Sequence, residues 1–305
     1  MRGRSIVAKV GVVTTVVSMS ILSTGVARAT PPIGGVAFTD LARVQIVDGA
    51  SVPIKLGTAL LSGVYSLGSG GQTGWRRLSG TTVLAATKGT LTVHKADGCG
   101  TKDYAAGQAG VVPAGTYLIE NSGSDPLEFY GVFINQAANA PKPLIGGPAA
   151  AAPACNGFRA ASAAPTGVSV SHPEVSTMVP GMFGRGAVLD IPAGKDMYAG
   201  FLDFSPGFRS GWITHFPQVS IVSGGVLTYV MARDGKCDTS DTYRSGQGFY
   251  HPAHRHMALN DGKDHVLLTS IYFGLPHDTP VPVIGNTITA NDFTQAPPAD
   301  CPRLF

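Results

Sequence analysis

Three histidines in the last third of the chain have the residue type and spacing for metal or small-molecule binding. His254 and His256 are two residues apart, and alternate residues of a β-strand face the same side, so their imidazoles would point together if this segment is a strand. His215 follows Ile213 with the same spacing. If both pairs face the interior of one barrel, three imidazoles can bind one ion, and such nitrogen ligands suit Zn, Fe, Ni or Cu.

The same residues also fit a pocket without a metal. In that interpretation His215, His254 and His256 are polar residues that bind a small molecule, and the pocket also contains Gln218 and Trp212. His251 precedes a proline, so we expect it to shape a turn and at most to support the site from outside the ligand set. Both interpretations require strands that bring these residues together.

The composition supplies such strands. The chain of 305 residues contains 40 Gly and 22 Pro, and its Val, Thr and Ile occur in short runs rather than in segments of helical period. This pattern is typical of short strands joined by tight turns. Because 44% of the residues are hydrophobic, the chain can bury a core, which argues against disorder. We therefore predict an all-β protein.

An internal repeat divides the chain into two copies, 62–135 and 199–274. The two tryptophans of the chain, Trp75 and Trp212, fall on each other at an offset of 137 residues. The repeat also aligns Gly89 with Gly225, Cys99 with Cys237, Tyr104 with Tyr243, Gln108 with Gln247, and Asn121 with Asn260. The order of short β segments and glycine turns within each copy predicts a closed antiparallel barrel or a jelly roll.

The second copy resembles the two sequence motifs of the cupin superfamily. The first matching stretch is Gly211-Trp212-Ile213-Thr214-His215, followed by Gly225; the second runs from Gly246 to Asn260, with His256 four residues before Asn260. With the duplication, this resemblance implies a bicupin, in which two cupin-type barrels (jelly rolls) follow one another. Its expected parts are barrel one (35–140), a Pro/Ala-rich linker or arm (141–165), barrel two (166–290) and a C-terminal arm (291–305).

Departures from the cupin motifs bear on function. In the second copy Ile213 replaces a family histidine, and Gln218 is the residue nearest to the expected glutamate. The aligned positions of the first copy are Arg76, Leu78, Gly115 and Tyr117. The resemblance therefore implies a degenerate first barrel that binds no catalytic metal and a second barrel with part of a ligand set.

These departures favour a protein that binds a small molecule in its second barrel without catalysis. The alternative is a mononuclear metal-dependent enzyme of the oxygenase or isomerase type, with His215, His254 and His256 as ligands. A third possibility is a structural envelope protein in which neither barrel binds anything. The sequence contains no His-Glu-x-x-His, Cys-x-x-Cys, Gly-Lys-Ser/Thr or Gly-x-Ser-x-Gly motif for another chemistry.

The N-terminus has the features of a secretory signal peptide. Basic residues within 1–9 precede an apolar run over 10–22, and Ala27-Arg28-Ala29 provides small residues before a cleavage site after Ala29. We expect residues 1–29 to be removed and the protein to be secreted, without stable membrane insertion. Their loss leaves 18 basic against 19 acidic residues, so the charge gives no argument for a nucleic-acid partner.

The four cysteines of an exported chain are expected to pair, because the compartment is oxidising. Three connectivities are possible for four cysteines. In the repeat, Cys99 is equivalent to Cys237, and each is followed by one further cysteine in its own copy. The symmetric pairing is therefore Cys99 with Cys155 and Cys237 with Cys301, which would tie each C-terminal arm to its own barrel.

Overall fold

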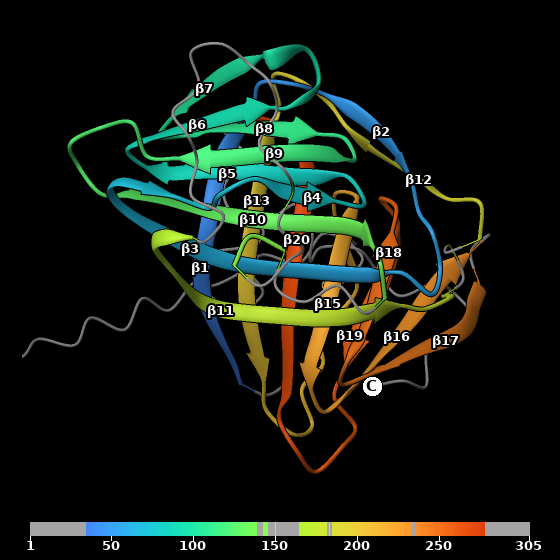
Figure 1. The fold of residues 1–305 in the computed structure, drawn as a ribbon. Helices are drawn as coiled ribbons and strands as arrows, with labels where there is room; N and C mark the ends of the chain where they lie inside the picture. The colour runs from blue at the N-terminus through green and yellow to red at the C-terminus, as the bar shows by residue number, and fades with distance from the viewer. Residues whose placement is uncertain are drawn as a thin grey trace, which may run out of the picture.

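A computed structural model describes residues 35–138, 143–145, 150, 165–181, 183, 185–233 and 236–277. Strands dominate this part of the chain (Figure 1), and the prediction of an all-β protein is confirmed. Within the described residues no helix has the length and apolar character needed to cross a membrane.

The first half of the fold consists of the strands β1–β10 and one 3-10 turn. The strands are β1 (Val36–Ile46), β2 (Ala50–Pro53), β3 (Ala59–Gln72), β4 (Arg76–Leu78), β5 (Thr82–Lys88), β6 (Thr90–Lys95), β7 (Thr101–Ala105), β8 (Gln108–Val112), β9 (Gly115–Glu120) and β10 (Leu127–Gln136). The 3-10 turn η1 (Asp97–Cys99) connects β6 to β7.

The second half consists of the strands β11–β20, in the same order along the chain. They are β11 (Thr166–Met178), β12 (Val188–Ile191), β13 (Asp196–Phe204), β14 (Ile213–Thr214), β15 (Gln218–Gly224), β16 (Val226–Arg233), β17 (Lys236–Arg244), β18 (Gln247–His251), β19 (Arg255–Leu259) and β20 (Val266–Leu275).

Strands of both halves close into one ten-stranded ring. The hydrogen-bonded order is β10-β5-β8-β1-β13-β20-β15-β18-β11-β3, and β3 pairs back onto β10. The first strand of each half pairs with the other half, because β1 lies antiparallel to β13 and β11 lies antiparallel to β3. Figure 1 shows β11 beside β3 and β1 beside β13. This exchange covers strand edges that each half would otherwise expose.

The expected tandem arrangement of two barrels is therefore not confirmed. Instead of two closed units joined by a linker, the halves share the ring, and each adds a smaller set of strands to it. In the second half this set is the sheet β14-β19-β16-β17; in the first half β4, β9, β6 and β7 continue from β3. A sequence repeat predicts equal units, but it contains no information on which unit a long first strand joins.

The repeat itself is visible in single hydrogen bonds. Asn121 donates from Nδ2 to the carbonyls of Leu67, Gly68 and Asp125 and accepts from the amide of Gly123. Asn260 makes the same four bonds, with the carbonyls of Phe204, Ser205 and Asp264 and the amide of Gly262. Two buried asparagines thus hold equivalent turns in the two halves.

Aligned glycines show the same equivalence in the backbone. Gly74 and Gly211, just before the two tryptophans, have φ angles of 67° and 71°. Gly107 and Gly246, in the turns before β8 and β18, have φ angles of 87° and 83°. This left-handed conformation favours glycine, since a side chain there is strained. The glycine spacing therefore reports turn geometry that both halves share.

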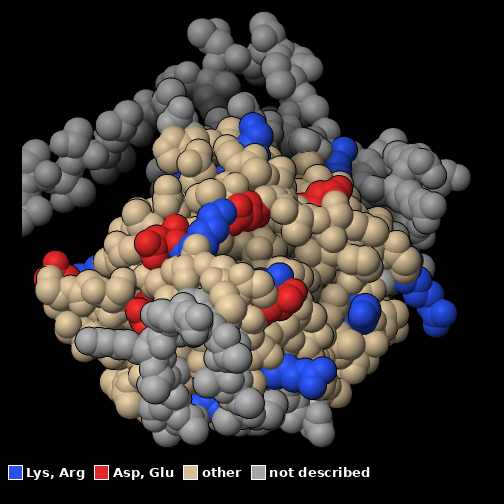
Figure 2. Space-filling view, turned by 45° about the horizontal axis from the view of Figure 1, so that its top comes forward, with Lys and Arg blue, Asp and Glu red and all other residues tan. Residues whose placement is uncertain are grey.

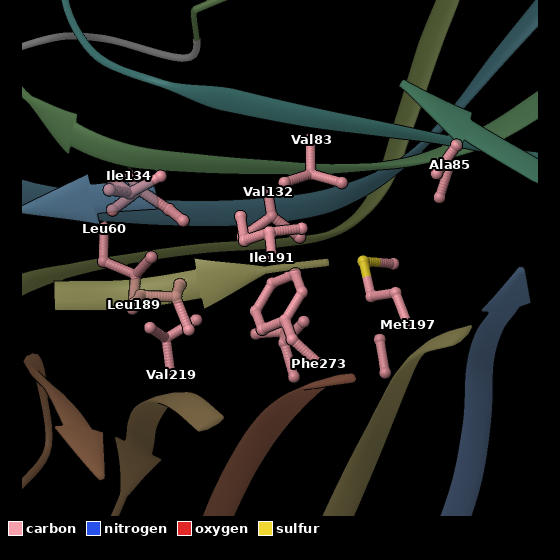
Figure 3. Packing of buried hydrophobic residues seen from close by; sticks show 14 of the residues in the cluster. Leu60, Val83, Ala85, Val132, Ile134, Leu189, Ile191, Met197, Val219 and Phe273 are labelled. Atoms are coloured by element: carbon pink, nitrogen blue, oxygen red, sulfur yellow. The ribbon is translucent and has the colours of Figure 1, made fainter. Parts of the chain in front are cut away.

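The largest apolar cluster combines residues of both halves (Figure 3). Val83 and Val132 from the first half pack in the same cluster as Val219 and Phe273 from the second. Two further clusters each join ring strands to the smaller strand set of one half. The shared cluster means that burying the ring interior requires both halves at once.

Several sequence predictions fall outside the described residues. These are the signal peptide 1–29, most of the linker 141–165, the arm 291–305, and the cysteines Cys155 and Cys301. Cys99, whose side chain is described, is not a free cysteine. The predicted cysteine pairing, the domain boundaries and secretion therefore stay predictions.

The surface carries charges of both signs. On the face shown in Figure 2, Lys and Arg side chains lie among Asp and Glu side chains. Ion pairs such as Lys102 with Asp48 and Arg209 with Asp261 contribute to this mixture. The described residues on this face thus carry charges of both signs.

Candidate metal centre

Strands from two sheets of the second half bring four histidines together. His215 follows β14, His251 ends β18, His254 lies in the connection to β19, and His256 is on β19. Cross-strand pairing sets their positions, because Ile213 of β14 lies opposite His256 and Gln218 of β15 lies opposite His251. We call His215, His251, His254 and His256 the histidine cluster.

The four rings lie close to one another. The ring centroid of His215 lies 5.0 Å from that of His254 and 4.6 Å from that of His256. The ring centroid of His254 lies 4.9 Å from those of His251 and His256. One ligand nitrogen each of His215, His251 and His254 lies within 4.8 Å of the other two, so these three residues can hold a metal ion. His256 adjoins this group without belonging to it.

Burial keeps the cluster neutral. It is the main cause that lowers the pKa of His215 from 6.5 to about 3, with the nearby His254 as a second cause. Burial and the neighbouring histidines also lower the pKa of His251 and His256 well below 6.5, and burial lowers that of His254. At neutral pH each ring therefore keeps one nitrogen lone pair, which is the form that binds metal ions.

Hydrogen bonds determine which nitrogen carries that lone pair in two of the rings. His215 Nδ1 lies 2.5 Å from the carbonyl oxygen of Phe216, and His254 Nδ1 lies 2.8 Å from that of Pro252. A carbonyl oxygen can only accept, so both Nδ1 atoms carry the hydrogen and both Nε2 atoms carry the lone pair. Neither Nε2 atom has a hydrogen-bond partner among the described atoms.

The other two histidines also present unpaired buried nitrogens. His251 Nε2 lies 3.0 Å from the hydroxyl of Tyr243, whereas its Nδ1 has no hydrogen-bond partner in the described part of the structure. The same holds for Nδ1 of His256. Four buried nitrogens without partners in one place are unusual, since buried polar atoms are normally hydrogen-bonded. A metal ion bound by His215, His251 and His254 would replace the missing hydrogen bonds of three of them.

The walls around the cluster are aromatic. The ring centroid of Tyr229 lies 4.6 Å from that of His256, Phe183 lies 4.7 Å from His254, and Tyr272 lies 5.9 Å from His215. Tyr243 and Phe249 stack on each other at 4.0 Å next to His251. Such walls restrict water, which strengthens the interaction of the imidazoles with a cation.

The predicted pocket residues are only in part brought together. His215, Gln218, His254 and His256 meet, and Gln218 Oε1 is a further buried atom without a partner among the described residues. Trp212 belongs to a different apolar cluster, with Val230, Met257 and Leu259. Because Met257 and His256 are neighbours on β19, their side chains face opposite sides of the sheet, and Trp212 packs on the side away from the histidines.

His251 is the ligand candidate that sequence reasoning placed outside the ligand set. Its position before a proline suggested a turn, yet it is the last residue of β18 and points to the cluster. The available signal was the two-residue alternation back through Phe249, which is also fully buried next to the cluster. His256, which was expected to be a ligand, takes the neighbouring position.

In the first half, other residue types occupy the equivalent pairings. Arg76 pairs with Tyr117 as Ile213 pairs with His256, and Leu78 pairs with Gly115 at the level of His215 and His254. Thr82 pairs with Val112 as Gln218 pairs with His251. The scaffold of the site is therefore present twice, but the imidazoles are present once among the described residues.

Comparisons with known proteins do not assign a family. No family model matches the chain, and no curated protein matches it. A solved structure of Bacillus subtilis oxalate decarboxylase, described for its Mn(II) centres, is 14% identical with a TM-score of 0.34, over 80% of this chain and 78% of that chain. A structure of the same enzyme at pH 4.6 gives the same identity and TM-score over 81% of this chain and 76% of that chain.

Similarity at this TM-score carries no argument about family or activity. The fold and the site define an all-β protein whose closed ring carries a buried cluster of four histidines in one of two repeated halves. Membership in the cupin superfamily stays a prediction that rests on the motif residues of the second copy.

Proposed function

We propose that the second half binds one divalent transition-metal ion through His215, His251 and His254, with His256 beside them. The observation that carries this proposal is the convergence of three buried, neutral imidazole nitrogens, one each from His215, His251 and His254, without hydrogen-bond partners in the described part of the chain. Leaving such atoms unpaired costs about 1–3 kcal/mol each, so a pocket that binds nothing is a poor explanation. This favours the metal alternative over the metal-free pocket.

The donor set limits the choice of metal. Three imidazoles without a carboxylate in the group suit Zn, Fe, Ni or Cu better than Mn, Mg or Ca. Three protein ligands leave at least one coordination position for water or a small molecule, as in catalytic sites. We therefore propose that a small-molecule ligand binds next to the ion, among the aromatic walls, and that the site can support metal-dependent chemistry.

The wider biological setting is proposed from the sequence. The N-terminal residues 1–29 support export with cleavage near Ala29, and the symmetric spacing of the cysteines supports two disulfides in an oxidising compartment. The cupin resemblance, with a first half that lacks the metal ligands, supports a bicupin with one metal centre.

Elemental analysis tests the metal proposal. The chain is purified without chelator, and its metal content and its affinity for Zn(II), Cu(II), Ni(II) and Fe(II) are measured by mass spectrometry and calorimetry. We expect about one equivalent per chain in the wild type. His251→Ala should lose it, whereas His256→Ala should bind more tightly than His251→Ala.

A surface histidine provides the matched control. His265 of the second half is exposed and pairs with Asp203, away from the cluster. His265→Ala should therefore keep the wild-type metal content. Metal well below one equivalent in the loaded wild type, or full binding by His251→Ala, would contradict the proposal.

A further inference from the structure

Tyr243 and Asp241 of β17 form a hydrogen-bonded chain that ends at the histidine cluster. The Tyr243 hydroxyl lies 3.1 Å from Asp241 Oδ2 and 3.0 Å from His251 Nε2. Tyr243 and His251 are buried, whereas Asp241 is half-buried on the edge strand of its sheet. The chain therefore runs from near the surface to the candidate metal centre.

The acceptors determine the direction of these bonds. A carboxylate only accepts, so the Tyr243 hydroxyl donates its single hydrogen to Asp241. It then has no hydrogen left for His251, so His251 Nε2 must be the donor to the Tyr243 oxygen. A neutral imidazole carries one N–H, and the lone pair of His251 is therefore on Nδ1. This is the nitrogen without a partner among the described atoms.

We propose that Tyr243, held by Asp241, is a positioning residue that keeps His251 in the Nε2–H tautomer and thereby presents Nδ1 to the metal. The inference rests on the proposed metal site. It predicts a mixed ligand set, because the carbonyls of Phe216 and Pro252 hold the other two ligands so that they present Nε2. Outer hydrogen bonds of this kind orient the ring and fix its tautomer.

The packing around Tyr243 leaves its hydroxyl little freedom. Its ring stacks on Phe249 at a centroid distance of 4.0 Å and an interplanar angle of 17°. The backbone at Gly181 lies so close that an added Cβ would be 2.0 Å from the Tyr243 hydroxyl oxygen and 2.8 Å from Asp241 Oδ2. A side chain at position 181 would therefore displace both groups, so the glycine keeps the hydrogen-bonded chain in place.

The first half contains the same tyrosine in a different role. Tyr104, the repeat equivalent of Tyr243, donates from its hydroxyl to Asp48 Oδ2 at 2.8 Å. Val112 takes the position of His251, so Tyr104 has no imidazole to orient. Tyr104 is therefore a matched control for the loss of a buried tyrosine hydroxyl next to a carboxylate.

The first experiment reads the tautomer without any metal. Long-range proton–nitrogen NMR spectra of the histidine-labelled full chain, in chelator, distinguish a protonated ring nitrogen from one with a lone pair. We expect His251 to be protonated on Nε2 in the wild type and in Tyr104→Phe, and to lose this preference in Tyr243→Phe. The Nδ1–H tautomer in the wild type, or an unchanged tautomer in Tyr243→Phe, would overturn the inference.

The second experiment measures the consequence for metal binding. In Tyr243→Phe the affinity for Zn(II) should fall by about 10–100-fold, which is typical for loss of an outer partner of a metal ligand. Asp241→Asn keeps an acceptor for the hydroxyl, so its loss should be smaller, and Tyr104→Phe should match the wild type. The spectrum of bound Cu(II) should change in Tyr243→Phe and remain unchanged in the control.

The two experiments separate the two ideas. A wild type that binds no metal but shows the expected tautomer contradicts the metal site and leaves Tyr243 as the residue that orients His251. A wild type that binds metal with the same affinity and Cu(II) spectrum as Tyr243→Phe contradicts the positioning role alone. Circular dichroism and the melting temperature show whether each variant is folded. If Tyr243→Phe is not folded, the tautomer and the metal affinity of Asp241→Asn test the positioning role instead.

Discussion

The two halves of this protein have the same scaffold and different interiors. Both keep the tryptophan, the left-handed glycines and the asparagine with four backbone hydrogen bonds. Where the second half has His215, His251 and His254, the first has Leu78, Val112 and Gly115. Residues that hold turns and strand ends are thus the same in both halves, whereas residues that face the site differ.

This difference separates stability from chemistry within one chain. Leu78 and Val112 are buried and carry no polar side-chain atom, so they contribute to the first half by apolar packing. At the equivalent positions the second half has imidazoles, with His215 and His251 buried and His254 half-buried, which is unfavourable unless something binds them. The comparison predicts that acid, metal and site mutations affect the second half, whereas scaffold mutations affect both halves equally.

The largest expected effect is acid destabilisation of the metal-free protein. The pKa of His215 is lowered from 6.5 to about 3, so the stability that its neutral form contributes is complete above pH 6.5 and is lost as the pH falls toward 3. At pH 4 this amounts to about 3 kcal/mol for such a residue. The other titratable groups facing it are His251, His254, His256 and Tyr272.

Urea unfolding in chelator between pH 7 and pH 4 measures this loss. The variant His215→Leu, which copies Leu78 of the first half, should show a shallower dependence of the unfolding free energy on pH, because one fewer proton is taken up. An identical slope in the variant and the wild type would show that His215 is not held neutral.

Metal addition should have the next largest effect on stability, and the added protection should lie in the second half. At a free metal concentration about 100 times the Kd, binding stabilises the native state by about 2.7 kcal/mol. Hydrogen exchange followed by mass spectrometry should show added protection in 213–224 and 247–259. The equivalent first-half segments, 76–88 and 108–120, are the internal control, and equal protection in both halves would contradict a single site.

Removal of the scaffold asparagines should have a moderate and symmetric effect. Asn121→Ala and Asn260→Ala each leave buried backbone groups unpaired, which costs about 1–3 kcal/mol. Denaturant unfolding should give losses of similar size, and Asn260→Ala should still bind metal. A loss of unfolding free energy in only one of the two variants would show that the two turns do not contribute equally to stability.

The smallest expected effect concerns the two hairpin glutamines. The side-chain oxygen of Gln108 accepts from the amide of Ala105, and that of Gln247 accepts from the amide of Arg244. Both bonds are partly open to solvent, so each Gln→Ala variant should lose about 0.5–1.5 kcal/mol. Thermal unfolding of the two variants in parallel measures this, and a shift in one variant alone would identify the hairpin that depends on its side chain.

Much of the fold and part of the site could be predicted from the sequence. Glycine spacing and the repeat indicate an all-β chain with equivalent turns, because those residues act through local backbone geometry. The alternation of His254 and His256 indicates a shared face, and His215 and Gln218 do reach it. Trp212 and His251 could not be placed in this way, since their surroundings depend on which strands pair.

The sequence by itself determined the β-strand elements, the duplication and the concentration of imidazoles in the second copy, because these features depend on residue type and local backbone conformation. The tertiary structure decided the rest. It placed β1 and β11 in the opposite halves, turned Trp212 away from the site and brought His251 next to Tyr243. These outcomes depend on long-range strand pairing and burial, which no local pattern specifies.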